Sequence, residues 1–292
     1  MRRTAISLPI ACLGVVLTFT IASATETTAI RVDFESDTVG PYTREMVKHD
    51  WGQVVWTNLH DRAHIVLEEQ APPNRALRIA YPAGAVGPSQ GGGQFIISLA
   101  PSEELWFSYR VKFGQGFDYA LGGKLPGLSS GGDKYTGGHK PKDGDGWSAR
   151  YMWGKNGKIV VYLYYVDMPG HWGEDLSLGG VKCVPGRWHQ LTQHIRVNTP
   201  GQANGVLDVW FDGKKALARS NIRFRIGEKG LIDSVDFETF HGGSTKEWAP
   251  TVDSFSFLDD FIVAAGPPDS LLDRGPNQAP AGTARTLPAP QH

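Results

Sequence analysis

The sequence predicts an all-β fold: one domain of two packed antiparallel sheets, with a two-sheet β-jelly roll of the concanavalin-like sandwich type as the natural candidate. Glycine (36) and proline (19) together supply 55 of the 292 residues, which favours many turns over long helices. Many segments alternate apolar and polar side chains, and no window repeats apolar residues at helical spacing. An apolar fraction of 40% with 11% aromatic residues is enough for a sizeable core.

The clearest strand covers residues 105–113, where Leu105, Phe107 and Tyr109 alternate with Ser108 and other polar side chains. The same pattern, bounded by Gly, Pro, Asn or Asp, predicts further strands. They cover residues 30–35, 76–81, 94–99, 148–153, 159–166, 191–197, 206–212, 232–240 and 254–263. So many strands in a single domain imply two sheets packed face to face.

Both ends of the chain differ from its middle. Residues 1–24 resemble a secretory signal: Arg2 and Arg3 precede an apolar stretch, and Ala22-Ser23-Ala24 is a small-x-small cleavage site. Residues 266–292 contain six prolines and few large apolar side chains, as in a Pro/Ala-rich flexible tail. We therefore expect a domain over residues 25–265 in a secreted or periplasmic protein that leaves the membrane once the signal is removed.

The charge and the cysteines exclude several classes of function. A formal net charge of −1 gives no basic field, so nucleic acid is not an expected partner. Removal of the signal would also remove Cys12, leaving Cys183 without a disulfide partner. His49, His60 and His64 lack metal-ligand neighbours in the sequence, so we expect no metal at these histidines. We also expect no cofactor, and we expect the protein to be a monomer.

One hairpin can be predicted in detail. Lys155-Asn156-Gly157 lies between two strand segments, and a three-residue loop with Gly in the left-handed conformation is a common hairpin connection. This loop pairs Arg150 with Tyr162 and Ser148 with Tyr164. All four side chains would share one face, because side chains alternate along each strand.

That face has an unusual composition for a protein core. Phenol rings stack on sugars and hydrogen-bond to their hydroxyls, and a guanidinium matches the two oxygens of a carboxylate. The four side chains therefore suit a site for an acidic sugar. A solvated outer face, on which Tyr and Arg simply cover the sheet, is an equally compatible interpretation.

A glycine-rich string makes the interpretation more specific. In Gly122-Gly123-Lys124-Leu125-Pro126-Gly127, Lys124 is held between two glycines and a Leu-Pro-Gly turn. This string, the preceding residues 113–118, Ser148-x-Arg150 and Tyr162-x-Tyr164 together resemble polysaccharide lyase family 14, the alginate and glucuronan lyases. Residues 91–95, 198–202, 242–244 and 248–250 also resemble sequences of this family, so the resemblance spans about residues 80–262.

The resemblance implies a β-jelly roll that cleaves uronic-acid polymers by β-elimination. It further implies that Lys124, Ser148, Arg150, Tyr162 and Tyr164 line the catalytic groove. Three further residues are expected to contact the anionic polysaccharide substrate: Gln94, His139 and His241. The segment of residues 129–146 departs from the family pattern, because it is long and rich in Gly and Lys. Such a segment suits a flap over the groove.

β-Elimination needs a cation or strong donors on the carboxylate, a base at the adjacent ring carbon and an acid at the leaving oxygen. The sequence shows no acidic cluster beside the expected site for a calcium ion. We therefore assign the neutralising role to Arg150 and an orienting role to Ser148. Tyr162, Tyr164 and Lys124 are all candidates for the base, with a tyrosine favoured if a nearby cation lowers its pKa.

Two other functions fit parts of the sequence. A glycoside hydrolase on this fold would need paired carboxylates on one strand, but Ser234-Val235-Asp236-Phe237-Glu238 has Ser at the leading position. That segment reads instead as an ordinary strand with exposed acids. A non-catalytic lectin-like module would explain the sheets and the aromatics, but not the convergence of Lys, Arg and two Tyr.

Overall fold

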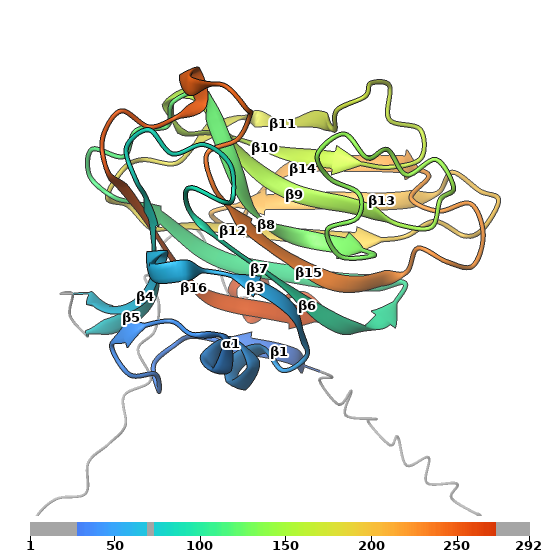
Figure 1. Ribbon diagram of the computed structural model, residues 1–292. Helices are drawn as coiled ribbons and strands as arrows, with labels where there is room; N and C mark the ends of the chain where they lie inside the picture. Colours follow the sequence, from blue (N-terminus) through green and yellow to red (C-terminus); the bar gives the residue numbers. More distant parts are fainter. Residues whose placement is uncertain (1–27, 69–72, 273–292) are drawn as a thin grey trace, which may run out of the picture.

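The computed structural model describes residues 28–68 and 73–272 and consists of two antiparallel sheets packed into a sandwich (Figure 1). The predicted all-β jelly-roll class is confirmed. The expected signal peptide and residues 273–292 of the expected tail lie outside the described residues. Within the described ranges, no helix is long and apolar enough to cross a membrane.

The larger sheet has nine strands. Eight of them follow the order β14 (Lys214–Ile222), β13 (Gly205–Phe211), β12 (His189–Arg196), β7 (Glu104–Phe113), β16 (Ser254–Ala264), β5 (Asn74–Tyr81), β4 (Ala63–Glu68) and β2 (Gly40–Pro41). The ninth, β1 (Thr28–Val32), pairs with β16.

The smaller sheet has seven strands. Their order is β11 (Glu174–Lys182), β10 (Lys158–Tyr164), β9 (Trp147–Gly154), β8 (Gly122–Ser130), β15 (Ile232–Thr239), β6 (Gly93–Ser102) and β3 (Val54–Asn58). Short helical segments connect some strands: α1 (Arg44–Trp51) and the 3₁₀ turns η1 (His60–Arg62), η2 (Lys155–Gly157) and η3 (Lys246–Trp248). Helix α2 (Asp269–Leu272) follows the last strand.

The apolar halves of the alternating strands meet between the sheets. Tyr109 of β7 packs edge-on against Tyr151 of β9, with ring centroids 6.2 Å apart. Gln193 of β12 is fully buried and crosses between the sheets: its amide donates to the Ala149 carbonyl and accepts from the Leu128 N–H. One side chain thereby satisfies backbone groups of β8 and β9, which would otherwise be unpaired in the core.

Two elements differ from the sequence-based expectation. Residues 122–127, expected to form a loop and turn around Lys124, belong to strand β8, which pairs with β9 and β15. Helix α1 was not expected, because its eight residues are too few for a sustained periodic pattern. It begins where the Thr43 hydroxyl accepts from the Met46 N–H, and it buries Val47 and Trp51, four residues apart.

The two ends of the described chain meet on the larger sheet. Arg31 of β1 lies 3.6 Å from Asp269 of α2, and the Gln190 side chain on β12 donates to the Ser270 hydroxyl at 2.7 Å. Residues 269–272 form helix α2. Their contacts show that the chain packs on the sandwich beyond the boundary expected at residue 265.

Candidate active site

The candidate site lies on the face of the smaller sheet that points away from the core. Lys124 of β8 lies opposite Met152 of β9, and its Nζ is 2.9 Å from the Met152 sulfur. The same Nζ lies 3.6 Å from the centre of the Tyr162 ring, the geometry of a cation–π contact. All three side chains are partly exposed, so a bound molecule can reach the amine.

The glycines before Lys124 are required by packing. A Cβ on Gly123 would lie 2.0 Å from the Trp153 ring and 2.4 Å from the Phe240 carbonyl oxygen. Gly122 adopts φ 143°, a conformation that favours glycine. These two residues bring β8 close to Trp153 and to the bridge with His241, and the backbone N–H of Lys124 donates to Phe240. The motif therefore fixes the backbone that carries Lys124.

The predicted hairpin register is confirmed. Tyr162 pairs with Arg150 and Tyr164 pairs with Ser148, across the turn Lys155–Gly157. Gly157 has φ 74°, as a three-residue loop of this kind requires. The four side chains thus start on one face of the sheet, as expected from the loop length.

Arg150 is held by carboxylates of the protein itself. It is 1% exposed, forms an ion pair with Glu238, and its Nε lies 3.5 Å from an Asp236 oxygen. Gln94 supports this arrangement from β6, because its amide nitrogen donates to Glu238 at 2.8 Å and its oxygen accepts from Asn58. Arg150 is therefore paired with protein carboxylates, although its Nε and Nη2 have no hydrogen-bond partner among the described residues, and its contact with a substrate carboxylate stays a prediction.

The acids of β15 were wrongly expected to be exposed. Asp236 and Glu238 are 0% and 5% exposed, and they form the acidic cluster that the sequence was expected to lack beside the site. Gly127 of β8 pairs with both Arg150 and Asp236, and a Cβ on Gly127 would lie 2.6 Å from the Arg150 Cα. The absence of a side chain there lets Arg150 reach the acids across β8.

Tyr164 and Ser148 lie beneath the segment after β8. Both are fully buried. The Ser148 hydroxyl donates to the Tyr135 carbonyl at 2.7 Å, and the Gly138 N–H donates to the Tyr164 hydroxyl at 3.0 Å. Of the expected flap, residues 129–146, the first two belong to β8. Residues 131–146 rest on this end of the site and separate both hydroxyls from solvent, and their role as a flap stays a prediction.

The two candidate histidines occupy contrasting places. His139 is exposed on the segment after β8, with Nδ1 3.0 Å from the Thr136 carbonyl. His241 is 1% exposed: its Nε2 contacts the Asp118 carbonyl at 2.7 Å and its ring stacks on Phe117. Burial lowers the pKa of His241. Its position is that of a packing residue, and substrate contact by either histidine stays a prediction.

The electrostatics favour a different base from the one the sequence favoured. Burial, with the neighbouring Arg150 charge, lowers the pKa of Lys124 well below its usual value. Burial together with Tyr164 raises the pKa of Tyr162, and this outweighs the opposite effect of Arg150. The lowered pKa favours the uncharged form of the Lys124 amine, whereas the raised pKa keeps the proton on the Tyr162 phenol.

Sequence reasoning missed several residues around Lys124. Met152 lies two positions after Arg150 on the same face, so the alternation of β9 could have identified it. Asp175 of β11 pairs with Tyr162 and raises the pKa of Lys124, in opposition to burial. Asp236 and Glu238 come from a strand some 85 residues later than β9 in the chain, and no local signal connects them to Arg150.

The face therefore combines a partly exposed amine with a lowered pKa, a protonated phenol beside it and a buried charge network. Such a site provides a base and an acid within reach of one bound molecule, as enzymes that act on sugar chains by acid–base chemistry require. Comparison with known proteins identifies the class. Residues 69–261 match the family model described as Polysaccharide lyase 14, and the chain belongs to this family; it is a polysaccharide lyase.

Solved structures agree with this assignment. The alginate lyase Aly36B is 26% identical, with a TM-score of 0.70, and the match covers 81% of this chain and 96% of that one. The PL-14 alginate lyase from Aplysia kurodai shares the fold at 23% identity and a TM-score of 0.69, over 82% of this chain and 100% of the other. The alginate lyase vAL-1 from Chlorella virus shares it at 21% identity and 0.64, over 79% and 99%. No curated protein sequence matched.

Proposed function

We propose that this polysaccharide lyase is an exported enzyme that cleaves 1,4-linked uronic-acid polymers by β-elimination, with alginate as the first substrate to test. The observation that carries the proposal is the position of Lys124, whose Nζ lies 3.6 Å over the Tyr162 ring in a partly exposed site. Alginate is placed before glucuronan because Aly36B, the similar structure with 26% identity, is described as an alginate lyase.

In the proposed reaction Lys124 is the base. Its uncharged amine takes the proton from the ring carbon beside the substrate carboxylate and becomes an ammonium ion. The electron pair left on carbon forms a double bond to the neighbouring ring carbon, and the bond from that carbon to the glycosidic oxygen breaks. Tyr162 donates its phenolic proton to the leaving oxygen and becomes a phenolate. A proton then passes from the Lys124 ammonium to the phenolate, which restores both groups.

The buried network tunes this pair. Burial and the Arg150 charge lower the pKa of Lys124, whereas Glu238 and Asp236, which hold the guanidinium below the sheet face, raise it. We assign Arg150 a positioning role, because it acts through Lys124 and the fold of the face. Tyr164, whose hydroxyl is 3.4 Å from that of Tyr162, orients the phenol for proton transfer.

The proposed export rests on the sequence of residues 1–24. An exported lyase meets polymers that are too large to cross a membrane, which agrees with a signal peptide before the domain. We also propose that the enzyme acts as a monomer, because Lys124, Met152 and Tyr162 all come from one sheet of one chain.

The proposal is tested with Lys124→Met, which removes the amine but retains the apolar part of the side chain. We expect turnover of alginate to fall by about 10²- to 10⁴-fold, read from the ultraviolet absorbance of the unsaturated uronate product. Lys215→Met is the matched control, because Lys215 also lies over an aromatic ring, that of Trp210, but on the larger sheet. This control should retain the activity of the unsubstituted enzyme.

The same assay separates the alternative functions. A glycoside hydrolase would release reducing ends without the absorbance, and a lectin-like module would bind the polymer without cleaving it. Equal rates for Lys124→Met and Lys215→Met would reject Lys124 as the base. A panel of mannuronate blocks, guluronate blocks, glucuronan and hyaluronan, with product sizes measured, would assign the polymer and distinguish endo from exo action.

A further inference from the structure

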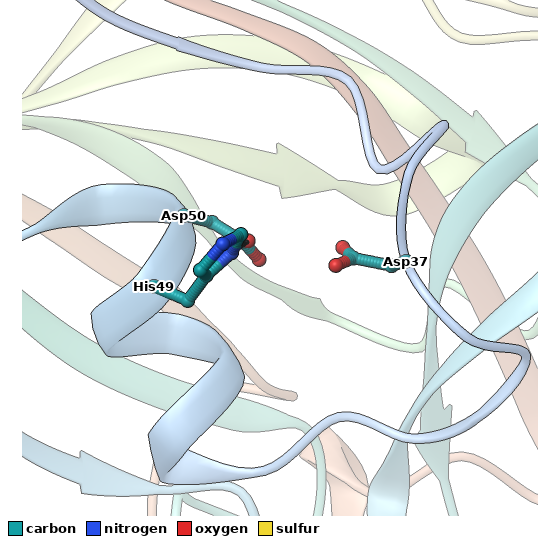
Figure 2. Close-up of side chains that lie close together, drawn as sticks. All are labelled: Asp37, His49 and Asp50. Carbon is teal, nitrogen blue, oxygen red and sulfur yellow. Dashed lines mark hydrogen bonds and ion pairs between the residues drawn. The ribbon is translucent and has the colours of Figure 1, made fainter.

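We propose that Asp37, His49 and Asp50 form a binding site for a divalent transition-metal ion of the zinc class, which joins the loop after β1 to helix α1 (Figure 2). Within the described ranges, these residues are the one group of three His, Cys, Asp or Glu side chains with ligand atoms close enough to share an ion. The site is distinct from the candidate active site.

The three side chains converge from two elements. His49 and Asp50 are consecutive residues in the last turn of α1, and Figure 2 shows the Asp37 carboxylate facing them across a gap from the neighbouring loop. The ligand atoms lie within 4.8 Å of one another. Ligands of a tetrahedral zinc ion are ~3.3 Å apart, so binding needs only a small contraction of these side chains.

Asp37 provides an independent reason to expect a cation. It is 9% exposed, and its Oδ2 has no hydrogen-bond donor among the described residues. A buried carboxylate oxygen without a donor is costly, and a second carboxylate facing it adds repulsion. A bound cation would remove both costs.

The remaining contacts suit metal ligands. Nδ1 of His49 lies 2.9 Å from one Asp50 oxygen, and the other Asp50 oxygen accepts from the Tyr42 hydroxyl at 2.6 Å. Trp51 Nε1 donates to that hydroxyl at 3.2 Å, which fixes Tyr42. Such supporting hydrogen bonds orient metal-binding carboxylates.

The donor set decides the class of ion. One imidazole and two carboxylates match zinc and related transition metals, with water completing the coordination. Calcium takes six to eight oxygen ligands, and this site offers too few. The exposed imidazole leaves the site open on one side, so an ion can enter from solvent without unfolding of the loop.

The location predicts a stabilising role. Helix α1 contacts β1 and β3, and β3 is the edge of the smaller sheet farthest from β10 and β11 (Figure 1). Trp51, next to the ligands, packs against Phe95, Phe237 and Phe261 in the core. An ion that fixes α1 to the loop would therefore hold the N-terminal segment on the sandwich and leave Lys124 unaffected.

The test uses the full chain after treatment with a chelator. Zinc chloride is added stepwise and followed by thermal unfolding and by isothermal titration calorimetry. We expect one zinc ion to bind per chain. Tm should rise by about 5 °C when the free zinc concentration is about 100 times the Kd. Calcium and magnesium at the same concentrations should give no comparable shift.

Variants make the assignment specific. Asp37→Asn and His49→Asn should each remove the zinc-dependent rise, while His60→Asn, at an exposed histidine on η1, should keep it. Asp37→Asn should also be at least as stable as the unsubstituted protein without metal, because it relieves repulsion from Asp50, so loss of folding does not obscure the result. The proposal is overturned by no zinc-dependent shift, by a shift that both variants retain, or by a larger effect of calcium.

Discussion

At the scale of single residues, the position of Arg150 below the sheet surface decides how the candidate site works. The Arg150 guanidinium lies beside two carboxylates of the protein, and its charge adds to burial in lowering the pKa of the Lys124 amine. The sequence placed Arg150 on the correct face, because strand alternation determines the face. Its depth depends on Asp236 and Glu238, which reach it from a distant strand.

Arg150→Met tests this interpretation. The substitution leaves two carboxylates buried without their cation, so we expect a loss of about 3–5 kcal/mol in the free energy of unfolding. Denaturant unfolding measures it. The double variant Arg150→Met/Glu238→Gln should recover part of that loss, since it removes the carboxylate that forms the ion pair with Arg150. Equal stability of the single and double variants would contradict the pairing.

Tyr162→Phe tests the division between base and acid. The ring that contacts Lys124 is retained and the proton donor is lost, so we expect kcat to fall about 10²-fold with little change in KM. Activity should still rise with pH as Lys124 loses its proton, because the low pKa of that amine does not need the hydroxyl. Tyr165→Phe is the control, since Tyr165 follows the end of β10, is buried and donates its hydroxyl to Glu174. Loss of the rise with pH in Tyr162→Phe would identify the tyrosine as the base.

At the scale of strands and helices, local patterns predicted the structure wherever pairing is local. The hairpin of β9 and β10 was predicted to the residue, because a three-residue loop fixes the register of the strands it joins. The Gly-Gly-Lys string was wrongly expected to be a loop, because glycine and proline usually interrupt strands. In β8 the glycines instead allow close approach of Trp153 and Arg150, and that contact has no local signal.

Strand β16 carries a pH-sensitive position. Asp259 lies where the register between β16 and β7 shifts. It is fully buried, and its carboxyl group accepts a hydrogen bond from Asn74. Burial raises its pKa to about 8. The folded carboxyl therefore keeps its proton between about pH 4 and pH 8, where the unfolded one has lost it. Unfolding releases that proton, so stability should fall as pH rises through this window.

Asp259→Asn measures the effect. We expect the stability of the variant relative to the unsubstituted protein to increase by about 4 kcal/mol between pH 5 and pH 8. Thermal unfolding at both pH values gives the comparison. An advantage of the same size at pH 5 and pH 8 would mean that Asp259 does not titrate in this range.

At the scale of the whole molecule, the composition and the alternation of apolar and polar side chains were sufficient to predict two packed sheets. A chain with many strands that are apolar on one face has few ways to bury those faces. The segment over the site and the Asp37–His49–Asp50 cluster were not predictable in the same way. Asp37 is twelve residues from His49, and only the packing of α1 brings them together.

Processing of the whole chain gives a further prediction. Export should remove residues 1–24 after Ala22-Ser23-Ala24, so the mature protein should begin at Thr25. Intact mass and N-terminal sequencing of the exported protein measure this directly. Replacing Ala22 and Ala24 by Leu should block cleavage and leave a heavier, membrane-associated product, whereas a start at Met1 in the exported protein would reject the signal.

The meeting of both ends of the described chain on the larger sheet has a practical consequence. Arg31 and Ser270 lie against β12 and β16, while Lys124 faces solvent on the opposite sheet. A bead, a fluorophore or a second enzyme attached by a linker at either end should therefore leave polymer access open. Immobilised preparations oriented through the termini should digest long chains as fast as short ones, whereas random coupling through surface lysines should slow the long chains selectively.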